Sequence, residues 1–344
     1  MLYFRLEKAM DTPICKKCVL PASPPEITLD AEGICNLCRG HEAAGAAKEP
    51  PPLESDFVKI MAQHRDKHPY DCLVMCSGGK DSTASLYYMK RRYKLRPLAF
   101  MFDHGFETED AVRNVQRAVE KLDVDFLSFR STFMHDIFSK ILKTGSQAVI
   151  CHLCSIWYMD LTYRMAERFD IPVIIAGWTK GQSTRQPVMS KCACNISEPE
   201  YKRMGLATRD FIDKHLKTDP RYKDFPPSME EAVSRAQKRH KSLVLSPHWF
   251  LPIEADEYVE TIKKELGWEY PALSYPAKST NCLLNFISVH NSMKNYGYTH
   301  YHVELSKMIR DGIITRDEAL ALLKPNYDTA LLNKIAEPLD YKFD

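Results

Sequence analysis

The sequence predicts an α/β protein with a doubly wound parallel sheet, an N-terminal cysteine module and a helical C-terminal region. Between residues 72 and 177, short apolar runs rich in β-branched and aromatic residues alternate with longer helical patterns. This alternation is typical of parallel sheets covered by helices. The chain has 344 residues, of which 44% are hydrophobic and 27% charged, so a globular protein with a sizeable core is expected.

The expected strands and helices follow one another as βα units. Strands are expected at 72–76, 97–102, 125–129 and 172–177. Helices are expected at 81–93, 108–121, 133–143 and 153–169. Because ligands of such sheets bind beyond the carboxyl ends of the strands, the loops after the strands are expected to form the functional site.

Changes in composition divide the chain into five parts, and a segment rich in Ala, Glu and Pro marks the linker. The parts are a four-cysteine module at 12–42, a linker at 43–54, a nucleotide-binding core at 55–195, an inserted polar helical segment at 196–245 and a mainly helical C-terminal region at 246–344 that completes the site.

Charge and hydropathy exclude some classes of protein. The formal net charge of +2 gives no global basic field for nucleic acid. No run approaches the roughly 18 apolar residues of a membrane span, and the N-terminal residues lack the features of a secretory signal. We therefore expect a cytoplasmic protein with no membrane partner, in which the eleven cysteines are ligands or reactive thiols rather than disulfides. A homodimer is the base-rate expectation for its assembly.

The stretch "VMCSGGKDSTASLYYM" predicts a strand, a tight loop and a helix. Two glycines let the backbone turn so that N–H groups face an anion, and the helix N-terminus adds its positive dipole end. A lysine ammonium and serine hydroxyls can contact phosphate oxygens. The residues predicted to do so are Ser77, Gly78, Gly79, Lys80, Asp81 and Ser82.

This loop is the SGGxDS signature of the PP-loop ATP pyrophosphatases, and the chain resembles that superfamily through its core. The resemblance implies a HUP-like fold in which ATP is split into AMP and pyrophosphate with the help of Mg²⁺, with Lys80 and Asp81 among the catalytic residues. It also suggests that Phe102 and Asp103, after the second strand, contact the nucleoside. The strand-end rule adds Gly177, Lys180 and Gln182 after the 172–177 strand, although the chain lacks the His- and Asp-bearing motif that the superfamily often has there.

Two CxxC pairs near the N-terminus have the spacing of a structural zinc site. Cys15 and Cys18 form the first pair, and Cys35 and Cys38 form the second. Four thiolates suit tetrahedral Zn²⁺, which would stabilise a module too small to fold by burial alone. A redox dithiol pair is the alternative.

The stretch "CKKCVLPASPPEITLDAEGICNLCR" and the C-terminal "YGYTHYHVELSKMIRDGIITRDEALALL" resemble the two ends of the N-acetyl sugar amidotransferases. These PP-loop enzymes convert an acetamido group into an acetamidino group. The resemblance implies a sugar acceptor and ammonia supplied by a glutaminase-type partner.

A third CxxC, Cys151 and Cys154, is only half of a metal site, and Cys282 is the cysteine that could complete it. The three resemble the tRNA thiolation enzymes of the superfamily, in which three cysteines hold an iron-sulfur cluster, here expected as 4Fe-4S, with one iron left free. Inert packing of buried thiols and a reactive or persulfide pair remain alternatives. The closely spaced Cys192 and Cys194 could add a ligand or a sulfur relay.

Three functions follow from these motifs. The first is an adenylating transferase that replaces a carbonyl or amide oxygen with sulfur, supplied by a sulfur donor protein. The second is the sugar amidotransferase, which uses ammonia. The third is a zinc-ribbon protein that only senses ATP. The near-neutral charge favours a small molecule or a sugar over tRNA as the acceptor.

Overall fold

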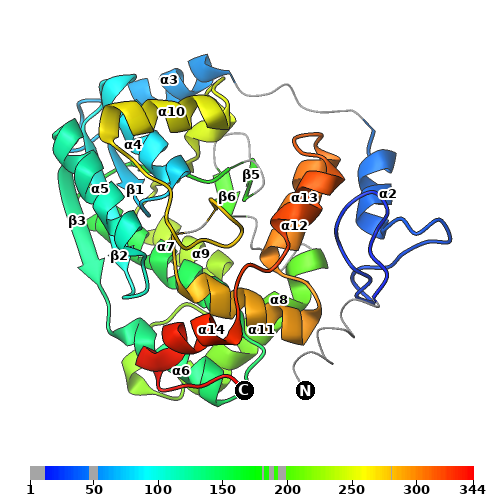
Figure 1. The fold of residues 1–344 in the computed structure, drawn as a ribbon. Helices are drawn as coiled ribbons and strands as arrows, with labels where there is room; N and C mark the ends of the chain where they lie inside the picture. The colour runs from blue at the N-terminus through cyan, green and yellow to red at the C-terminus, as the bar shows by residue number, and fades with distance from the viewer. Residues whose placement is uncertain (1–11, 46–52, 180–181, 186–189, 193–198, 280) are drawn as a thin grey trace.

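The computed structural model describes residues 12–45, 53–179, 182–185, 190–192, 199–279 and 281–344. Figure 1 shows a helix-covered sheet, a C-terminal group of helices beside it, and the cysteine module on the far side of that group. Within the part of the chain that is described, no helix is long and apolar enough to cross a membrane.

The core is a parallel five-stranded sheet with the order β3-β2-β1-β4-β7. Its strands are β1 (Cys72–Met75), β2 (Pro97–Asp103), β3 (Asp125–Arg130), β4 (Val173–Ile175) and β7 (Leu243–Leu245). The first four confirm the predicted strands. From β1 the chain continues to β2 and β3 on one side, and β4 and β7 lie on the other side of β1. The strand order therefore reverses between β1 and β4. Parallel sheets of this kind bind ligands at such a reversal.

The fifth strand, β7, was not predicted. It lies at the end of the 196–245 segment, which was expected to be an inserted helical segment. Its three residues pair in parallel with β4, and the Ala176 N–H donates to the Leu245 carbonyl at 2.9 Å. So short a run has no periodicity of its own, so pairing with β4 decides its structure.

Helices cover both faces of the sheet and bury its alternating side chains. On one face, Val74 of β1 packs with residues of α4 (Lys80–Arg91), α5 (Glu109–Leu122) and α10 (Ala255–Leu266). On the other face, Leu73 packs with residues of α6 (Phe133–Lys143), α7 (Ile150–Arg168) and α11 (Leu284–Tyr296). Helices α4 to α7 confirm the four predicted helices within a few residues at each end.

The remaining elements are short or lie outside this core. The helices are α2 (Asn36–Ala43), α3 (Glu54–Ala62), α8 (Pro199–Phe211), η1 (Ile212–Leu216), η2 (Pro220–Tyr222), α9 (Met229–Arg239), η3 (Pro247–Trp249), α12 (His300–Arg310), α13 (Arg316–Leu322), α14 (Thr329–Ala336) and η4 (Glu337–Leu339). Strands β5 (Ser183–Arg185) and β6 (Ser190–Cys192) form an antiparallel pair. The helical C-terminal region is as predicted.

The four-cysteine module packs on α12 and α13, as Figure 1 shows. The Val19 N–H donates to the Ser306 hydroxyl of α12 at 3.3 Å. The Arg316 guanidinium of α13 donates to the Cys18 carbonyl at 3.0 Å. These contacts place α12 between the module and the sheet.

Candidate active site

The loop between β1 and α4 requires glycine at Gly78 and leaves little room for a side chain at Gly79. Gly78 has a φ of +77°, and a Cβ atom there would lie 2.2 Å from the Ala111 carbonyl oxygen. A Cβ atom on Gly79 would lie 2.4 Å from the Asn281 amide nitrogen. Gly79 also precedes the first turn of α4, whose N–H groups lack helical partners. The loop therefore has the tight turn and the free donors of an anion site.

Hydrogen bonds hold this loop in place. The Ser77 N–H donates to Ser82 Oγ at 3.2 Å, and the two serine hydroxyl oxygens lie 3.1 Å apart. The Gly78 carbonyl accepts from Trp268 Nε1 at 2.9 Å and from Asn114 Nδ2 at 3.2 Å. Residues far apart in the sequence thus hold the loop in this conformation.

Lys80 and Asp81 form an ion pair at the start of α4. Lys80 Nζ lies 2.7 Å from Asp81 Oδ1 and 3.3 Å from the Tyr258 hydroxyl. The Tyr258 hydroxyl donates to the same carboxylate. Burial and the charge of Asp81 raise the pKa of Tyr258 well above its usual value, so its hydroxyl stays a donor. Tyr258 lies on α10 and was not predicted.

A pocket of about 200 Å³ opens beside the loop at the carboxyl ends of β1 and β4. A Cβ atom on Gly177 would lie 2.6 Å from Ser82 Cα, so glycine permits the close approach of the two loops. Ser155 and Asn281 also line the pocket and were not predicted. The predicted residues that line it are Ser77, Gly79, Asp81, Ser82, Gly177 and Gln182.

Other predicted positions lie elsewhere. Phe102 is 3% exposed and packs in the core, with its ring centroid 5.6 Å from that of Tyr158. Asp103 accepts a hydrogen bond from the Gly105 N–H at 2.7 Å. Neither lines the nucleotide pocket. Lys180 and Cys194 fall outside the described residues, and Cys192 ends strand β6.

Two distant segments bring the three core cysteines together at the carboxyl end of β2. Cys151 and Cys154 lie at the start of α7. Residues 281–283 pair with residues 106–108 through two backbone hydrogen bonds of 2.8 Å, which carries Cys282 to the same place. All three side chains are half-buried. The Cys151 thiol interacts electrostatically with the other two, so the three thiols lie near one another. The ligand atoms that lie within 4.8 Å of one another here are those of His104, Glu107 and Cys282.

His104 and Glu107 accompany these thiols, and neither was predicted. His104 Nε2 lies 3.0 Å from Glu107 Oε1 and 3.6 Å from Cys282 Sγ. Burial by itself would lower the pKa of His104, but Glu107, Cys282 and Cys154 outweigh it and raise this pKa well above its usual value. The signal in the sequence was their position in "FDHGFE", directly after a strand.

Two of these thiols have raised pKa values in the free protein. Burial raises the pKa of Cys151 to about 12. Burial also raises the pKa of Cys282, although His104 opposes the shift. A reactive thiol at the start of a helix would have a lowered pKa, and Cys151 does not have one. A bound metal or cluster would have to displace the thiol protons.

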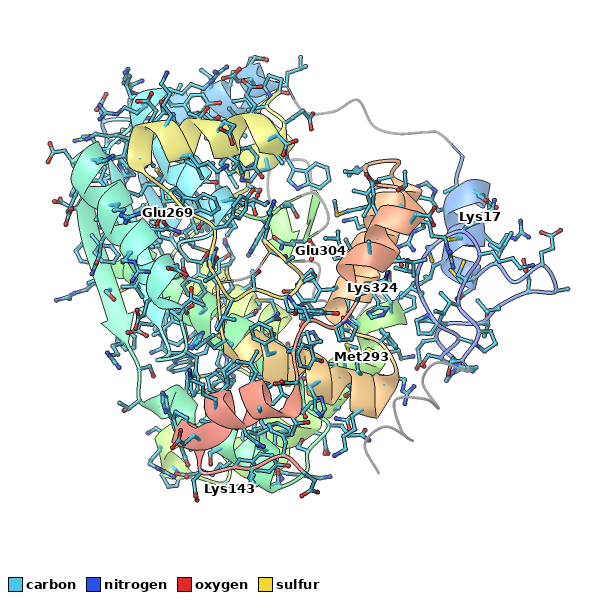
Figure 2. The ribbon with its side chains drawn as sticks, viewed as in Figure 1. Lys17, Lys143, Glu269, Met293, Glu304 and Lys324 are labelled. Atoms are coloured by element: carbon cyan, nitrogen blue, oxygen red, sulfur yellow. The ribbon has the colours of Figure 1, made fainter. Side chains whose placement is uncertain are left out.

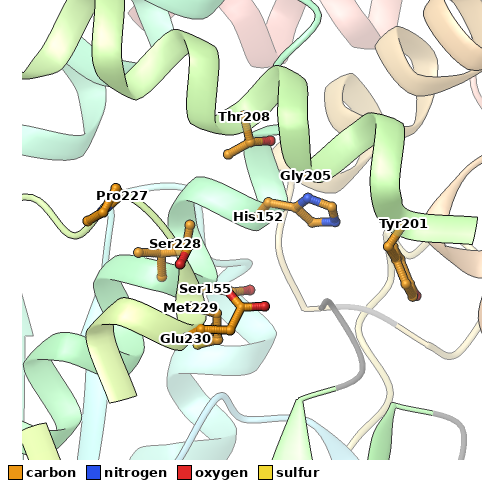
Figure 3. Close-up of a pocket in the computed structure, with 10 residues that line it drawn as sticks. His152, Ser155, Tyr201, Gly205, Thr208, Pro227, Ser228, Met229 and Glu230 are labelled. Carbon is orange, nitrogen blue, oxygen red and sulfur yellow. The ribbon is translucent and has the colours of Figure 1, made fainter. Parts of the chain in front are cut away.

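A narrow side pocket adjoins the nucleotide pocket and shares Ser155 and Met229 with it. Figure 3 shows His152 reaching into this space from α7. The side chain of His152 is 6% exposed, and burial lowers its pKa to about 4, so the ring is neutral. The cavity volume of about 20 Å³ suits a single water-sized group.

The four N-terminal cysteines converge as predicted. Their sulfur atoms all lie within 4.8 Å of one another and are buried. Cys15 Sγ lies 3.9 Å from Cys38 Sγ, and Cys18 Sγ lies 3.7 Å from Cys35 Sγ. A tetrahedral ion with metal–sulfur bonds of about 2.3 Å needs sulfur atoms about 3.8 Å apart. The arrangement therefore fits one four-coordinate metal ion.

Comparison with known proteins adds a family match and several distant relatives. The family model described as queuosine biosynthesis protein QueC matches residues 71–155. An uncharacterized protein of Methanocaldococcus jannaschii is 22% identical over 250 residues, which are 73% of this chain and 71% of the relative.

Among solved structures, the U34-tRNA thiolase NcsA of Methanococcus maripaludis with its 4Fe-4S cluster is similar with a TM-score of 0.36 and 14% identity, over 92% of each chain. The NMN synthetase of Francisella tularensis has a TM-score of 0.40 and 10% identity, over 85% of this chain and 96% of that chain.

The family match spans β1, the phosphate loop and the start of α7. These segments supply part of the lining of the pocket at the reversal point of the parallel sheet, whereas Gly177 and Asn281 of the lining lie outside the match. With the SGGxDS loop between β1 and α4, they show that this chain has the fold of the PP-loop ATP pyrophosphatase superfamily.

Proposed function

We propose that this chain is an adenylating transferase. It splits ATP into AMP and pyrophosphate, transfers AMP to a carbonyl or amide oxygen of an acceptor, and replaces that oxygen with sulfur. The observation that supports sulfur is the meeting of Cys151, Cys154 and Cys282 next to the nucleotide pocket. Ser155 and Asn281, the sequence neighbours of two of these cysteines, line that pocket.

The residues of the phosphate loop suit the adenylation step. The acceptor oxygen attacks the α-phosphorus, the bond to the bridging oxygen breaks, and pyrophosphate leaves with the electron pair. Lys80 and the N–H groups at the start of α4 lie where they can stabilise this charge. Mg²⁺ takes most of its ligands from phosphate oxygens and water. ATP and solvent can therefore supply most of the ligands of the ion.

The three core cysteines fit an iron-sulfur cluster, because thiolates are the usual ligands of such clusters. When bound, the cluster supplies an iron without a cysteine ligand, where exogenous sulfide can be held near the activated carbon. The half-buried position of the thiols beside the pocket suits this role. His104, 3.6 Å from Cys282, would stabilise negative charge on the sulfur ligands.

We also propose that the four N-terminal cysteines hold a structural Zn²⁺ ion. Several backbone N–H groups point at the sulfur atoms, and the Cys35 N–H lies 3.2 Å from Cys15 Sγ. Such donors stabilise thiolates. The acceptor is proposed to be a small molecule or a sugar, because the chain has a formal charge of only +2. A separate sulfur donor protein and a homodimeric assembly complete the proposal.

Anaerobic purification tests the sulfur proposal. We expect a brown protein that contains iron and acid-labile sulfide in addition to zinc. The double variant Cys151→Ala/Cys282→Ala should lose the iron, because two of the three proposed cysteine ligands of the cluster are removed. The rate of sulfur transfer should fall at least about 100-fold. ATP binding should persist, since the phosphate loop is intact.

The variant Cys72→Ala is the matched control, because Cys72 is buried in β1 away from the site. It should keep the iron. A colourless wild-type protein without iron, whose activity survives the double substitution, would refute sulfur transfer. Ammonia-dependent AMP release with an N-acetyl sugar would instead establish the amidotransferase, and no pyrophosphate release with any acceptor would favour an ATP sensor.

A further inference from the structure

Glu304 carries a half-buried carboxyl group from α12 to the nucleotide site. Its side chain forms hydrogen bonds with Gln182 and Thr179, which follow β4, and Gln182 lines the nucleotide pocket. Figure 2 shows Glu304 on the side of α12 that faces the sheet rather than the cysteine module. A residue more than 200 positions from the phosphate loop is thus hydrogen-bonded to a residue that lines the pocket.

Among the described residues, charged groups of both signs lie around Glu304. Asp81 and Lys80 act on it from α4, with opposite effects on its charge. Tyr258 of α10 is hydrogen-bonded to Asp81. On α12 itself, His300 lies one turn earlier, and burial lowers its pKa to about 3, so it is neutral. Lys80 is already paired with Asp81, and Lys307 lies one turn after Glu304 on α12.

ATP brings several negative charges into this setting. An ionised Glu304 would repel the phosphate oxygens, and the half-buried site screens this repulsion less than bulk water does. A protonated carboxyl group would instead donate a hydrogen bond to a phosphate oxygen. Binding of ATP therefore favours the protonated form of Glu304.

We propose that Glu304 is a nucleotide-binding residue whose carboxyl group takes up a proton from solvent when ATP binds and then donates a hydrogen bond to a phosphate oxygen. This inference rests on the proposed use of ATP. It assigns a role to the C-terminal region that is separate from the phosphate loop and from the cysteines.

The electrostatics of the free protein support this assignment. Burial and the charge of Asp81 raise the pKa of Glu304 to about 7, although Lys80 and the hydrogen bonds with Gln182 and Thr179 oppose the shift. The nearby phosphates would raise this pKa further. Above about pH 7 the group is then mostly ionised in the free protein and protonated in the complex, so the affinity for ATP falls as the pH rises.

Isothermal titration with ATP in buffers of different ionisation enthalpy measures this proton uptake. The expected values follow if the pKa of Glu304 is near 7 in the free protein and rises well above 8 in the complex. The wild type should then take up more protons than Glu304→Gln on binding ATP, by about 0.5 proton at about pH 7 and about 0.9 at about pH 8. Its affinity should fall roughly fivefold between these two pH values, beyond any change in the variant. The phosphate groups of ATP also titrate, but they do so equally in both proteins.

Glu260→Gln is the matched control, because Glu260 is exposed on α10 and pairs only with Lys263 in the described contacts. It should behave as the wild type, and circular dichroism checks that each variant is folded. Equal proton uptake in the wild type and Glu304→Gln would overturn the inference. A loss of affinity in Glu304→Gln only when Mg²⁺ is present would make Glu304 a metal ligand instead. Absence of any ATP binding by the wild type would count against the proposed function itself.

Discussion

Gly78 joins the phosphate loop to α5 and to the C-terminal region through close contacts and hydrogen bonds. Its backbone has a positive φ, its missing side chain makes room for the Ala111 carbonyl, and its own carbonyl accepts from Trp268 and Asn114. A single methyl group here would meet the backbone of a helix, which cannot move aside as a flexible side chain can. The loop conformation therefore depends on this glycine for two separate reasons.

The substitution Gly78→Ala should lower the free energy of unfolding by more than about 2 kcal/mol. Positive φ alone costs a non-glycine residue about 1 kcal/mol, and the contact of 2.2 Å adds the cost of shifting α5. Chemical denaturation measures the loss. Nucleotide affinity should fall as well, because the N–H groups of the loop move with the backbone.

Gly145→Ala separates the two causes. Gly145 has a φ of +62°, but a Cβ atom added there would have no described atom within 4 Å, so only the backbone cost applies. It should lose about 1 kcal/mol. If both variants are equally destabilised, the close contact between the loop and α5 does not exist in solution.

The residues of the site that could be predicted are those that adjoin one another in the sequence. Ser77 to Ser82 form a continuous motif, and their chemistry is visible without a structure. Tyr258 and Glu304 interact with Asp81 of this motif, and His104 lies beside Cys282. None of them belongs to a motif, and a lone Tyr, Glu or His in a sequence is not distinctive. Cys282 was identified because a half-site of two cysteines requires further ligands, which is a chemical constraint that acts across long separations.

At the scale of elements, helices from three parts of the chain meet around Asp81 of the phosphate loop. Helix α4 carries Lys80 and Asp81, α10 carries Tyr258, and α12 carries Glu304. Helix α10 packs against α4 through buried side chains that include Leu86 and Ile262. This packing fixes the distance between the Tyr258 hydroxyl and the ion pair at the start of α4.

The substitution Tyr258→Phe tests whether α10 tunes this ion pair. Without the hydroxyl, Asp81 loses a donor and holds Lys80 more strongly, so less positive charge is available to phosphate. The affinity for ATP should fall roughly fivefold, which corresponds to one hydrogen bond of about 1 kcal/mol. Equilibrium binding of ATP measures this.

Tyr87→Phe on α4 is the control, because Tyr87 packs edge-on against Tyr88 and lies outside the pocket lining. Its affinity for ATP should be unchanged. An unchanged affinity in Tyr258→Phe as well would show that α10 supports the fold but does not act on the ion pair.

The elements that could be predicted are those with a strong pattern. Four strands and four helices of the core follow from alternating apolar runs and amphipathic stretches. Strand β7 could not be predicted, because a run of three residues is too short to show a hydrophobic periodicity. Its strand structure comes from pairing with β4. Because this run is so short, the whole segment 196–245 was expected to be an inserted helical segment. Its last residues instead form the fifth strand of the sheet.

At the scale of the whole molecule, α12 joins two sites that lie far apart in the sequence. One side contacts the cysteine module through Ser306, and the other carries Glu304 toward the nucleotide pocket. Buried residues of the module, such as Leu20, share a hydrophobic cluster with Val303 of α12 and Val149 next to Cys151. A metal ion bound by the module should therefore stabilise the active site as well as the module itself.

The double variant Cys35→Ser/Cys38→Ser removes two ligands of the proposed zinc ion without touching the core cysteines. Because the module folds around its metal, its contacts with α12 should weaken, and the backbone amides of α12 should exchange hydrogen at least about tenfold faster. Amides of β1 should remain protected, since the sheet has its own core. Lys17→Ala, which removes only a surface ion pair of the module, should leave both unchanged. If zinc is lost while exchange in α12 stays slow, the module and the nucleotide site are independent, and the position of Glu304 is set by the C-terminal helices alone.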